Sequence, residues 1–307
     1  MKIYMNSANE NWVVDRFINE WNTYNFKTTK FIWMNPDIVW IITPWTWNKI
    51  PKRYLKKKKV ICTIHHIDED KFNNIEKSNF QNRDKYVDHY HVVSKKTFEQ
   101  VSKLTHKPIT TIPFWVNNNI WFNIEKTNSL REKYNFDDNQ YLIGSFQRDT
   151  EGSDLISPKL SKGPDQFFNI VKHLKSTKKN VCVILTGKRR EYLINKFSQE
   201  GISYKYFPMV NFKKLNELYN ILDLYIVASR FEGGPASILE CAITKTPIIS
   251  TDVGLSSEVL SSSSIFDMDN FQNAIPNVEF AYNNALEYKI PKGFDKYNQL
   301  LRKLHES

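Results

Sequence analysis

Two carboxylates that flank a glycine turn are the side chains of this sequence best placed to do chemistry. Residues 229–240 read Ser-Arg-Phe-Glu-Gly-Gly-Pro-Ala-Ser-Ile-Leu-Glu, so Glu232 lies in the turn and Glu240 follows about two helical turns later. An apolar run at 224–228 predicts a buried strand before the turn, and Pro235 stands where a first helical residue is favoured. A helix start offers unpaired N–H groups and a positive dipole end. We therefore expect an anion such as a pyrophosphate to bind there, with the two glutamates addressing opposite ends of one elongated ligand.

This segment, together with the strand pattern at 247–251 and Gly254 after it, resembles the signature of the retaining GT-B glycosyltransferases, in particular the family 4 group. In that group a glutamate is followed after seven residues by a second one. Without this context, two glutamates at that spacing would be interpreted as solvated helix charges. The resemblance implies an α/β GT-B fold, in which two doubly wound Rossmann-like domains face a central cleft. A carboxylate suits a vicinal diol, so Glu240 is expected to hold the ribose, while Glu232 faces the sugar. Backbone groups of the turn and helix start are expected to meet sugar hydroxyls or phosphate oxygens: Gly233, Gly234, Ala236 and Ser237.

A second pair of motifs supplies cations for a departing diphosphate, whose negative charge needs stabilisation. Gly144-Ser-Phe-Gln-Arg148 ends one predicted strand, and Lys162-Gly163 opens the next predicted helix. They resemble the family's Gly-x-x-x-Arg and Lys-Gly pair, which implies that Arg148 and Lys162 grip the diphosphate without a metal ion. Residues 149–161 are longer than the usual spacing, so Lys159 competes for this role. A surface lysine beside a helix cap is the alternative for Lys162.

Residues of the first half are candidates for the acceptor side. The predicted strand at 59–64 runs into His65 and His66, and the resemblance implies a histidine near the sugar at this turn. Trp45 and Trp47 follow the predicted strand at 37–43, where they could stack on a sugar face or a base. Structural histidines and core packing of the tryptophans are the alternatives.

No residue cluster in the sequence has the spacing of a metal site. The run Asp68-Glu69-Asp70 resembles an Asp-x-Asp site only superficially, and we favour a solvated helix start. The cysteines lie in apolar patterns and are expected to be buried free thiols: Cys62, Cys182 and Cys241. We expect neither a metal ion nor another cofactor. For Asp252 and Gly254, a structural role in a turn and a contact with the ligand both stay open.

Short apolar strands alternate with helical patterns, which indicates parallel sheets built from βαβ units. We expect strands at 2–5, 37–43, 59–64, 89–93, 110–112, 141–146, 181–186, 204–207, 224–227 and 247–251, and helices that include 10–24, 95–104, 271–286 and 294–305. The pattern breaks in an Asn-rich stretch at 117–128. We therefore expect an N-terminal acceptor-side Rossmann-like domain over 1–122 and a nucleotide-sugar-binding Rossmann-like domain over 123–290. By resemblance, a helix over 291–307 packs back across the hinge. Phe114 and Trp115 replace the family's Asn and Gly, so the turn there must differ.

Composition agrees with two domains and favours a polyanionic partner. The chain has 307 residues, 41% hydrophobic content and a formal net charge of +10. The basic run at 52–59 is interpreted as a solvated connection, with an anionic membrane or nucleic acid as the alternatives. No apolar run reaches the roughly 18 residues of a membrane span, and the start lacks a signal-peptide pattern. We expect a cytoplasmic protein, and a peripheral position at the inner face of a membrane stays open. The tryptophans all fall in the first part of the chain: Trp12, Trp21, Trp33, Trp40, Trp45, Trp47, Trp115 and Trp121.

The resemblance implies a retaining, metal-independent glycosyltransferase. It would move a hexose from a UDP- or GDP-linked sugar to a hydroxyl of a saccharide or glycolipid. Two alternatives stay open. A phage-type DNA-base sugar transferase would suit the positive charge, and a non-catalytic nucleotide-sugar-binding module would keep the same scaffold. An epimerase is disfavoured because we find no acid/base constellation.

Overall fold

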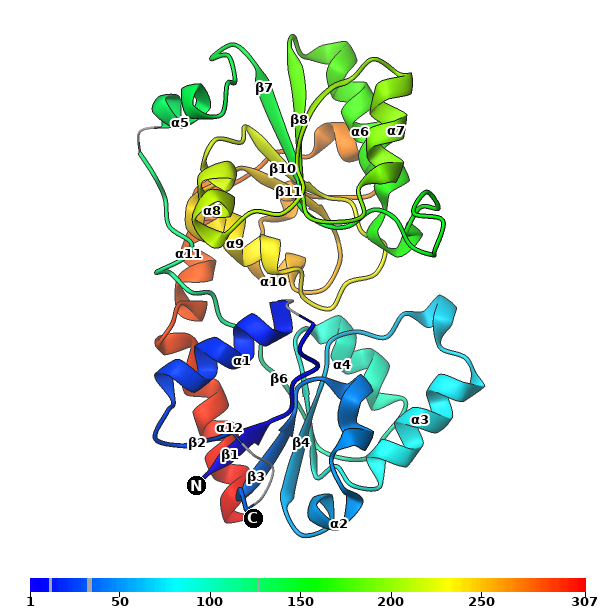
Figure 1. Ribbon diagram of the computed structural model, residues 1–307, viewed down its shortest axis with the longest axis vertical. Helices are drawn as coiled ribbons and strands as arrows, with labels where there is room; N and C mark the ends of the chain where they lie inside the picture. Colours follow the sequence, from blue (N-terminus) through cyan, green and yellow to red (C-terminus); the bar gives the residue numbers. More distant parts are fainter. Residues whose placement is uncertain (11–12, 32–34, 126) are drawn as a thin grey trace. The chain divides into compact units, whose positions relative to one another are not determined.

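The computed structural model describes residues 1–10, 13–31, 35–125 and 127–307. The chain divides into two compact units. Unit 1 comprises Met1–Trp115 and Tyr288–Ser307, and unit 2 comprises Val116–Glu287. Each unit has one parallel sheet with helices against it, as Figure 1 shows. This is the α/β architecture of two Rossmann-like domains that the sequence predicted, and the fold prediction is confirmed.

The sheet of unit 1 has the order β2-β1-β3-β4-β5-β6 among the described strands, all paired in parallel. Its strands are β1 (Ile3–Met5), β2 (Thr29–Lys30), β3 (Ile38–Ile41), β4 (Lys59–Ile64), β5 (His89–Val92) and β6 (Ile109–Thr111). Its helices are α1 (Val13–Tyr24), α2 (Lys52–Leu55), α3 (Asn74–Asp84), α4 (Lys95–Ser102) and α12 (Asp295–Glu306), with 3-10 turns η1 (Pro44–Lys49), η2 (Glu69–Lys71) and η7 (Lys292–Phe294).

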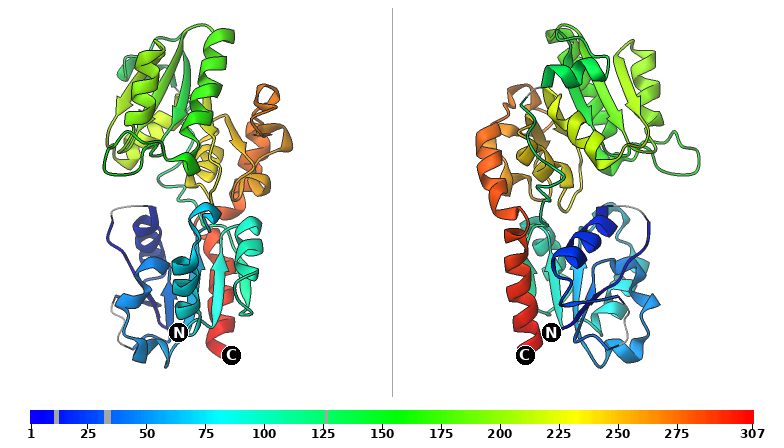
Figure 2. Two further views of the ribbon diagram at one scale, coloured as in Figure 1. Left: turned by 90° about the vertical axis from the view of Figure 1, so that its right-hand side faces the viewer. Right: turned by 60° about the vertical axis from the view of Figure 1, so that its left-hand side comes forward.

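Alternate residues of a strand point to opposite faces of the sheet, and both faces of this sheet are buried. Ile38 and Trp40 of β3 belong to one apolar cluster, and Val39 and Ile41 belong to another. The first cluster includes α1 and α12, so the end of the chain completes the core of unit 1 (red in Figure 2).

The sheet of unit 2 has the order β12-β11-β10-β7-β8-β9, again with parallel pairing of the described strands. Its strands are β7 (Tyr141–Ser145), β8 (Val181–Thr186), β9 (Ser203–Phe207), β10 (Leu224–Val227), β11 (Ile248–Thr251) and β12 (Ile265–Phe266). Its helices are α5 (Thr127–Lys133), α6 (Pro164–Thr177), α7 (Glu191–Gln199), α8 (Phe212–Asn220), α9 (Ala236–Thr244), α10 (Ser256–Val259) and α11 (Val278–Ala285), and its 3-10 turns are η3 (Leu160–Lys162), η4 (Ser262–Ser264) and η5 (Phe271–Asn273). A further 3-10 turn, η6 (Leu286–Tyr288), joins the two units along the chain.

The units divide after Trp115 rather than at the predicted residue 122. Phe114 and Trp115 are buried in the core of unit 1, where the Trp115 indole N–H donates to Glu20 over 2.8 Å. The Trp121 ring instead lies 5.7 Å from that of Tyr219 in unit 2. Trp121, which the predicted boundary assigns to the first domain, therefore packs in unit 2. Trp12 and Trp33 lie outside the described residues.

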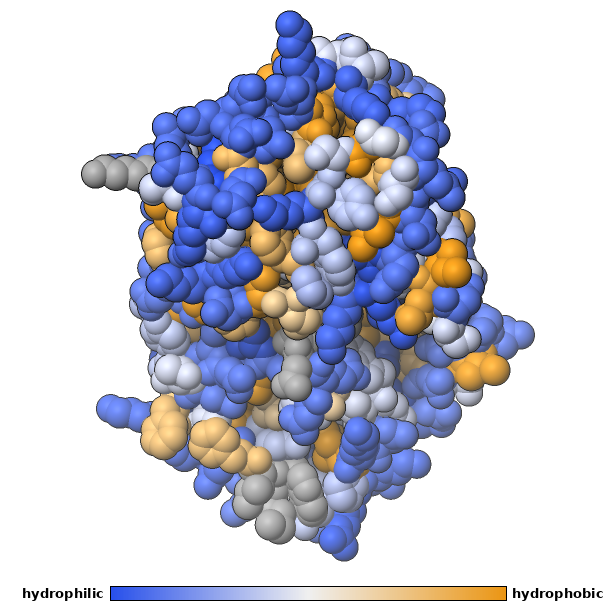
Figure 3. All heavy atoms as spheres, turned by 45° about the horizontal axis from the view of Figure 1, so that its top comes forward, coloured by the Kyte–Doolittle hydropathy of each residue, from blue (hydrophilic) through white to orange (hydrophobic). Residues whose placement is uncertain are grey.

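Hydrophilic residues cover most of the face shown in Figure 3, with apolar residues in small separate groups. Within the described ranges, no helix has the length and apolar character needed to cross a membrane.

Candidate functional site

The glycine turn of unit 2 links β10 to α9 at the carboxyl end of the sheet. Ser229 is fully buried, and the Thr251 hydroxyl donates to its carbonyl oxygen over 2.6 Å. Gly254, which follows β11, has φ +54°, and a Cβ atom there would lie 2.5 Å from the Gly233 carbonyl oxygen. The two loops therefore pack backbone against backbone. This contact gives Gly254 a structural role, whereas Asp252, two residues before it, is exposed.

Lys162 is positioned by an equally close backbone contact. It ends η3 and is followed by Gly163, whose φ of +59° lies in the left-handed region. A Cβ atom on Gly163 would lie 1.7 Å from the carbonyl oxygen of Ala228, just after β10. Only glycine allows this approach, which carries Lys162 to the turn that holds Glu232.

Lys162 and Glu232 form an ion pair between Nζ and Oε1, although 70 positions separate them in the sequence. Their side chains are only 17% and 9% exposed, so each charge depends largely on the other for stabilisation. The structure thus brings together the residue predicted to grip the diphosphate and the residue predicted to face the sugar.

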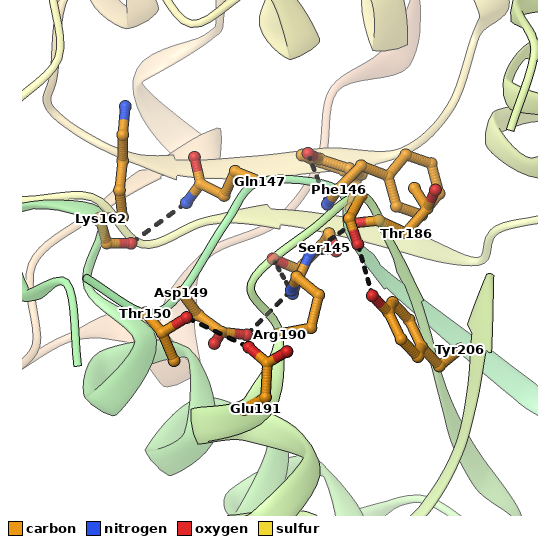
Figure 4. A network of polar contacts seen from close by, with 12 residues as sticks. Ser145, Phe146, Gln147, Asp149, Thr150, Lys162, Thr186, Arg190, Glu191 and Tyr206 are labelled. Carbon is orange, nitrogen blue, oxygen red and sulfur yellow. Dashed lines mark hydrogen bonds and ion pairs between the residues drawn. The ribbon is translucent and has the colours of Figure 1, made fainter. Parts of the chain in front are cut away.

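Two further side chains, which the sequence analysis did not identify, hold this pair. The Gln147 carboxamide donates to the Lys162 carbonyl oxygen over 3.1 Å (Figure 4) and to the Ser229 hydroxyl over 3.3 Å. The Ser229 hydroxyl donates in turn to Glu232 Oε1 over 3.3 Å. Gln147 and Ser229 each follow the carboxyl end of a strand, which is the only sequence signal that could have indicated them.

The residues that make the segment before Lys162 unusually long form a small hairpin. Thr150 forms an antiparallel bridge with Pro158, and the Lys159 amide donates to the Asp149 carbonyl oxygen over 2.8 Å. The extra residues therefore project from the fold without displacing Lys162. Arg148, the other predicted diphosphate ligand, is exposed at the base of this hairpin.

A buried arginine, Arg190, fixes the loops after β7 and β8 (Figure 4). It is fully buried and donates to Asp149 Oδ2 over 2.8 Å, to the Ser145 carbonyl oxygen over 2.6 Å and to that of Thr186 over 3.0 Å. Burial raises the pKa of Asp149 to about 6, against the opposing charge of Arg190. We interpret Arg190 as structural, because its donors are directed to the protein.

Glu240, the predicted ribose ligand, is 6% exposed in α9 and accepts a hydrogen bond from the Tyr219 hydroxyl over 2.9 Å. Burial raises the pKa of Tyr219 well above its usual value, and the Glu240 carboxylate adds to this shift. The phenol therefore remains a hydrogen-bond donor at neutral pH. Sequence reasoning missed Tyr219 because its helix reads as an ordinary amphipathic pattern.

The other predicted donor-binding residues separate into two groups. Gly144 is buried within β7, and a Cβ atom there would lie 2.3 Å from Leu222 Cδ1, so close packing favours a small residue at this position. Gly234, Ala236 and Ser237 are partly exposed at the turn and the start of α9, where first-turn amides lack intrahelical acceptors.

In unit 1, His65 lies beside Trp45 and Phe114 after the carboxyl end of β4. Its Nε2 lies 2.8 Å from the Ile42 carbonyl oxygen, which can only accept, so Nε2 carries the proton. Burial lowers the pKa of His65 to about 4, although the hydrogen bond to Ile42 acts to raise it. The ring stacks on Phe114, with centroids 5.6 Å apart. Phe114, which replaces the family's Asn, thus supports the histidine.

Trp45 and Trp47 have different surroundings, although both belong to η1. Trp45 is 47% exposed, its ring lies 6.0 Å from that of His65, and its indole N–H donates to Glu10 over 3.2 Å. Trp47 is partly buried against the core and lies 5.7 Å from the Tyr86 ring. These contacts favour Trp45 for acceptor binding and packing for Trp47.

The remaining candidates of unit 1 lie at its surface. His66 is exposed. The basic run at 52–59 forms α2, the turn after it and the start of β4, with Leu55 buried and most of the cationic side chains exposed.

The acidic run at 68–70 and the cysteines were the candidates considered for metal binding. Glu69 and Asp70 are exposed in η2, beside the partly buried Asp68. Among the residues that the structure describes, no group of three His, Cys, Asp or Glu side chains is arranged to hold a metal ion. The cysteines are buried free thiols, as expected: Cys62, Cys182 and Cys241.

Residues 155–280 match a family model described as "Glycosyl transferases group 1". The matched range includes Lys162, Glu232 and Glu240, but not Arg148. No curated protein sequence gives a significant match to the chain.

Solved structures match nearly the whole chain. Anabaena Alr3699/HepE in complex with UDP and glucose has 11% sequence identity and a TM-score of 0.78, over 99% of this chain and 100% of that chain. Sucrose-phosphate synthase from Thermosynechococcus elongatus has 12% identity and a TM-score of 0.67, over 95% of this chain and 78% of that chain. A mutant of S. aureus TarM in complex with Fondaparinux, alpha-GlcNAc-glycerol and UDP has 14% identity and a TM-score of 0.63, over 96% of this chain and 59% of that chain. At these identities the structures show the fold alone. They share the GT-B fold with this chain, and the family-model match adds a sequence similarity to glycosyltransferases over residues 155–280.

Proposed function

We propose that this protein is a retaining, metal-independent glycosyltransferase that moves a hexose from a nucleoside diphosphate sugar to a hydroxyl of a saccharide or glycolipid. The observation that carries this proposal is the convergence of Lys162 and Glu232 at the start of α9, with Glu240 further along the same helix. Lys162 and Glu232 come from segments 70 positions apart in sequence and meet at the carboxyl end of one sheet, where open α/β folds bind ligands.

The chemistry follows from the charges. When the bond between the sugar and the diphosphate breaks, negative charge develops on the leaving phosphate. Lys162 and the amide groups at the start of α9 supply positive charge at that point. Arg148 would add a second cation. In a retaining mechanism the acceptor hydroxyl attacks the face that the diphosphate leaves, and a phosphate oxygen takes its proton. This scheme requires no protein nucleophile.

A UDP-linked donor and a saccharide acceptor are supported by the similar structures. Alr3699/HepE is described in complex with UDP-glucose, and a TarM mutant with Fondaparinux, alpha-GlcNAc-glycerol and UDP. In unit 1, Trp45 and His65 form the patch that we propose for acceptor contacts, with His66 beside it. The His65 Nδ1, which carries no proton, would accept a hydrogen bond from an acceptor hydroxyl.

The proposal is tested by donor profiling. The purified protein is incubated with UDP- and GDP-linked hexoses, and release of nucleoside diphosphate is measured with and without saccharide acceptors and with EDTA. We expect release from one donor class, stimulation by an acceptor and no loss with EDTA, and an α-linked donor should give an α-linked product by NMR. Lys162→Ala should mainly lower turnover, because charge on the leaving group grows toward the transition state. Release that requires added magnesium would contradict metal independence, and transfer to DNA bases would favour the DNA-modifying alternative.

A further inference from the structure

The Lys162–Glu232 ion pair joins two residues that the proposed function assigns to different parts of one donor. In that proposal Lys162 binds the diphosphate and Glu232 binds the hexose. In the structure they neutralise each other while both are largely buried. A diphosphate that takes Lys162 as its partner must therefore displace the Glu232 carboxylate, and that carboxylate then needs new hydrogen-bond donors.

We propose that Glu232 competes with the diphosphate for Lys162, and that the hexose of the donor relieves this competition. The inference rests on the proposed function. With an intact nucleotide sugar, phosphate oxygens accept from Lys162 and sugar hydroxyls donate to Glu232, so both charges are satisfied. After transfer the hexose has left with the acceptor. Glu232 then has no sugar hydroxyl to bind, returns to Lys162, and weakens the hold on the nucleoside diphosphate. The ion pair thereby favours the donor over the spent nucleotide.

The surroundings allow such an exchange without rebuilding the site. Gln147 holds the Lys162 backbone and the Ser229 hydroxyl, and Ser229 donates to Glu232. Ser229 is itself fixed by Thr251. The two backbones therefore stay in place when the ion pair opens, and only the ends of two side chains need to move. Gln147 and Ser229 are positioning residues in this account.

The neighbouring ion pair provides a contrast. Arg230 binds both carboxylate oxygens of Asp165, over 2.7 and 2.6 Å, and its side chain is 35% exposed. In this bidentate geometry the guanidinium binds both carboxylate oxygens, so neither side chain requires a further hydrogen-bond partner. Lys162, in contrast, presents a single ammonium group to a carboxylate, and exchanges partners by a small rotation.

Calorimetric titration with UDP and GDP tests the competition. Glu232→Gln removes the competing charge and should bind the nucleoside diphosphate about tenfold more tightly than the wild type, as expected for one charge-assisted contact. The gain should vanish when Lys162→Met is added, because the competition acts only through the lysine. The wild type should prefer the nucleotide sugar over the nucleoside diphosphate by a larger factor than Glu232→Gln does.

A matched control separates this effect from a general change of charge. Glu279→Gln is the same substitution at an exposed glutamate of α11, which pairs with Lys245 at the end of α9, and it should leave nucleotide affinity unchanged. If Glu232→Gln does not fold, Glu232→Asp keeps the charge but withdraws the carboxylate from Lys162, and should also bind more tightly. An unchanged or lower affinity in the folded Glu232 variants, or an equal gain in Glu279→Gln, would refute the competition and leave the proposed function standing. A wild type that binds neither UDP nor GDP would refute the proposed function itself.

Discussion

Substitution of Gly163 by alanine should disable the donor site without removing any group that touches the donor. The added Cβ would lie 1.7 Å from the Ala228 carbonyl oxygen, whereas ordinary contact begins at 3.4 Å. The difference, 3.4 − 1.7, means that the loop carrying Lys162 must move by about 1.7 Å. Overpacking of this kind costs about 1–3 kcal/mol, and a left-handed conformation in alanine adds about 1–2 kcal/mol.

Gly201→Ala is the matched control. Gly201 has the same φ of +59°, but a Cβ atom there would come no closer than 3.9 Å to its nearest neighbour, Lys175 Nζ. It should therefore show the backbone cost alone, about 1–2 kcal/mol. Urea denaturation measures both stabilities, and calorimetry measures UDP affinity. We expect Gly163→Ala to lose an additional 10- to 100-fold in affinity, which corresponds to roughly 1.5–3 kcal/mol for a misplaced charged hydrogen bond. Equal stability and equal affinity of the two variants would refute the reasoning that the Gly163 contact positions Lys162.

Four other outcomes are expected. Glu240→Ala should lose on the order of 2 kcal/mol of nucleotide affinity in calorimetry, and an unchanged affinity would exclude Glu240 as the ribose ligand. Turnover should survive EDTA, whereas loss of activity that magnesium or manganese restores would refute metal independence. Burial lowers the pKa of His91, a fully buried residue of β5, to about 3. The neutral ring therefore favours the folded state above the usual pKa near 6.5, and this stability is lost as the pH falls toward 3. The unfolding free energy should drop by about 2 kcal/mol between pH 7 and pH 5 through this group, and a His91→Gln variant with an equally large drop would show that another group is responsible. Trp45→Ala should impair acceptor use while donor hydrolysis persists, and Trp47→Ala should instead lower stability. Equal acceptor kinetics for Trp45→Ala and the wild type would exclude the aromatic contact.

Much of the fold could be predicted because parallel strands buried on both faces are continuous apolar runs. Every strand of three or more residues in the structure overlaps a predicted one. The two that were missed, β2 and β12, have two residues each, too few for a pattern. The predicted boundary at residue 122 followed the break in the strand and helix pattern at the Asn-rich stretch, 117–128. In the structure, Trp115 packs in the core of unit 1 and Trp121 packs in unit 2, so the division falls between them.

The candidate site could be predicted residue by residue but not as a network. Glu232 and Lys162 stand out through their motifs, yet spacing cannot show that they form an ion pair across 70 positions. The roles of Gln147 and Tyr219 depend on hydrogen bonds between separate loops, and single polar residues in such loops carry no signal of their partners. The contact of Gly163 with Ala228 is likewise a property of the folded chain.

A crystal structure of the protein with UDP tests the central claim most directly. The account predicts diphosphate oxygens within hydrogen-bond distance of Lys162 Nζ and of the amides at the start of α9, the ribose hydroxyls at the Glu240 carboxylate, and a Glu232 carboxylate separated from Lys162. UDP bound elsewhere, or a bound diphosphate beside an intact Lys162–Glu232 pair with no ribose contact to Glu240, would contradict it.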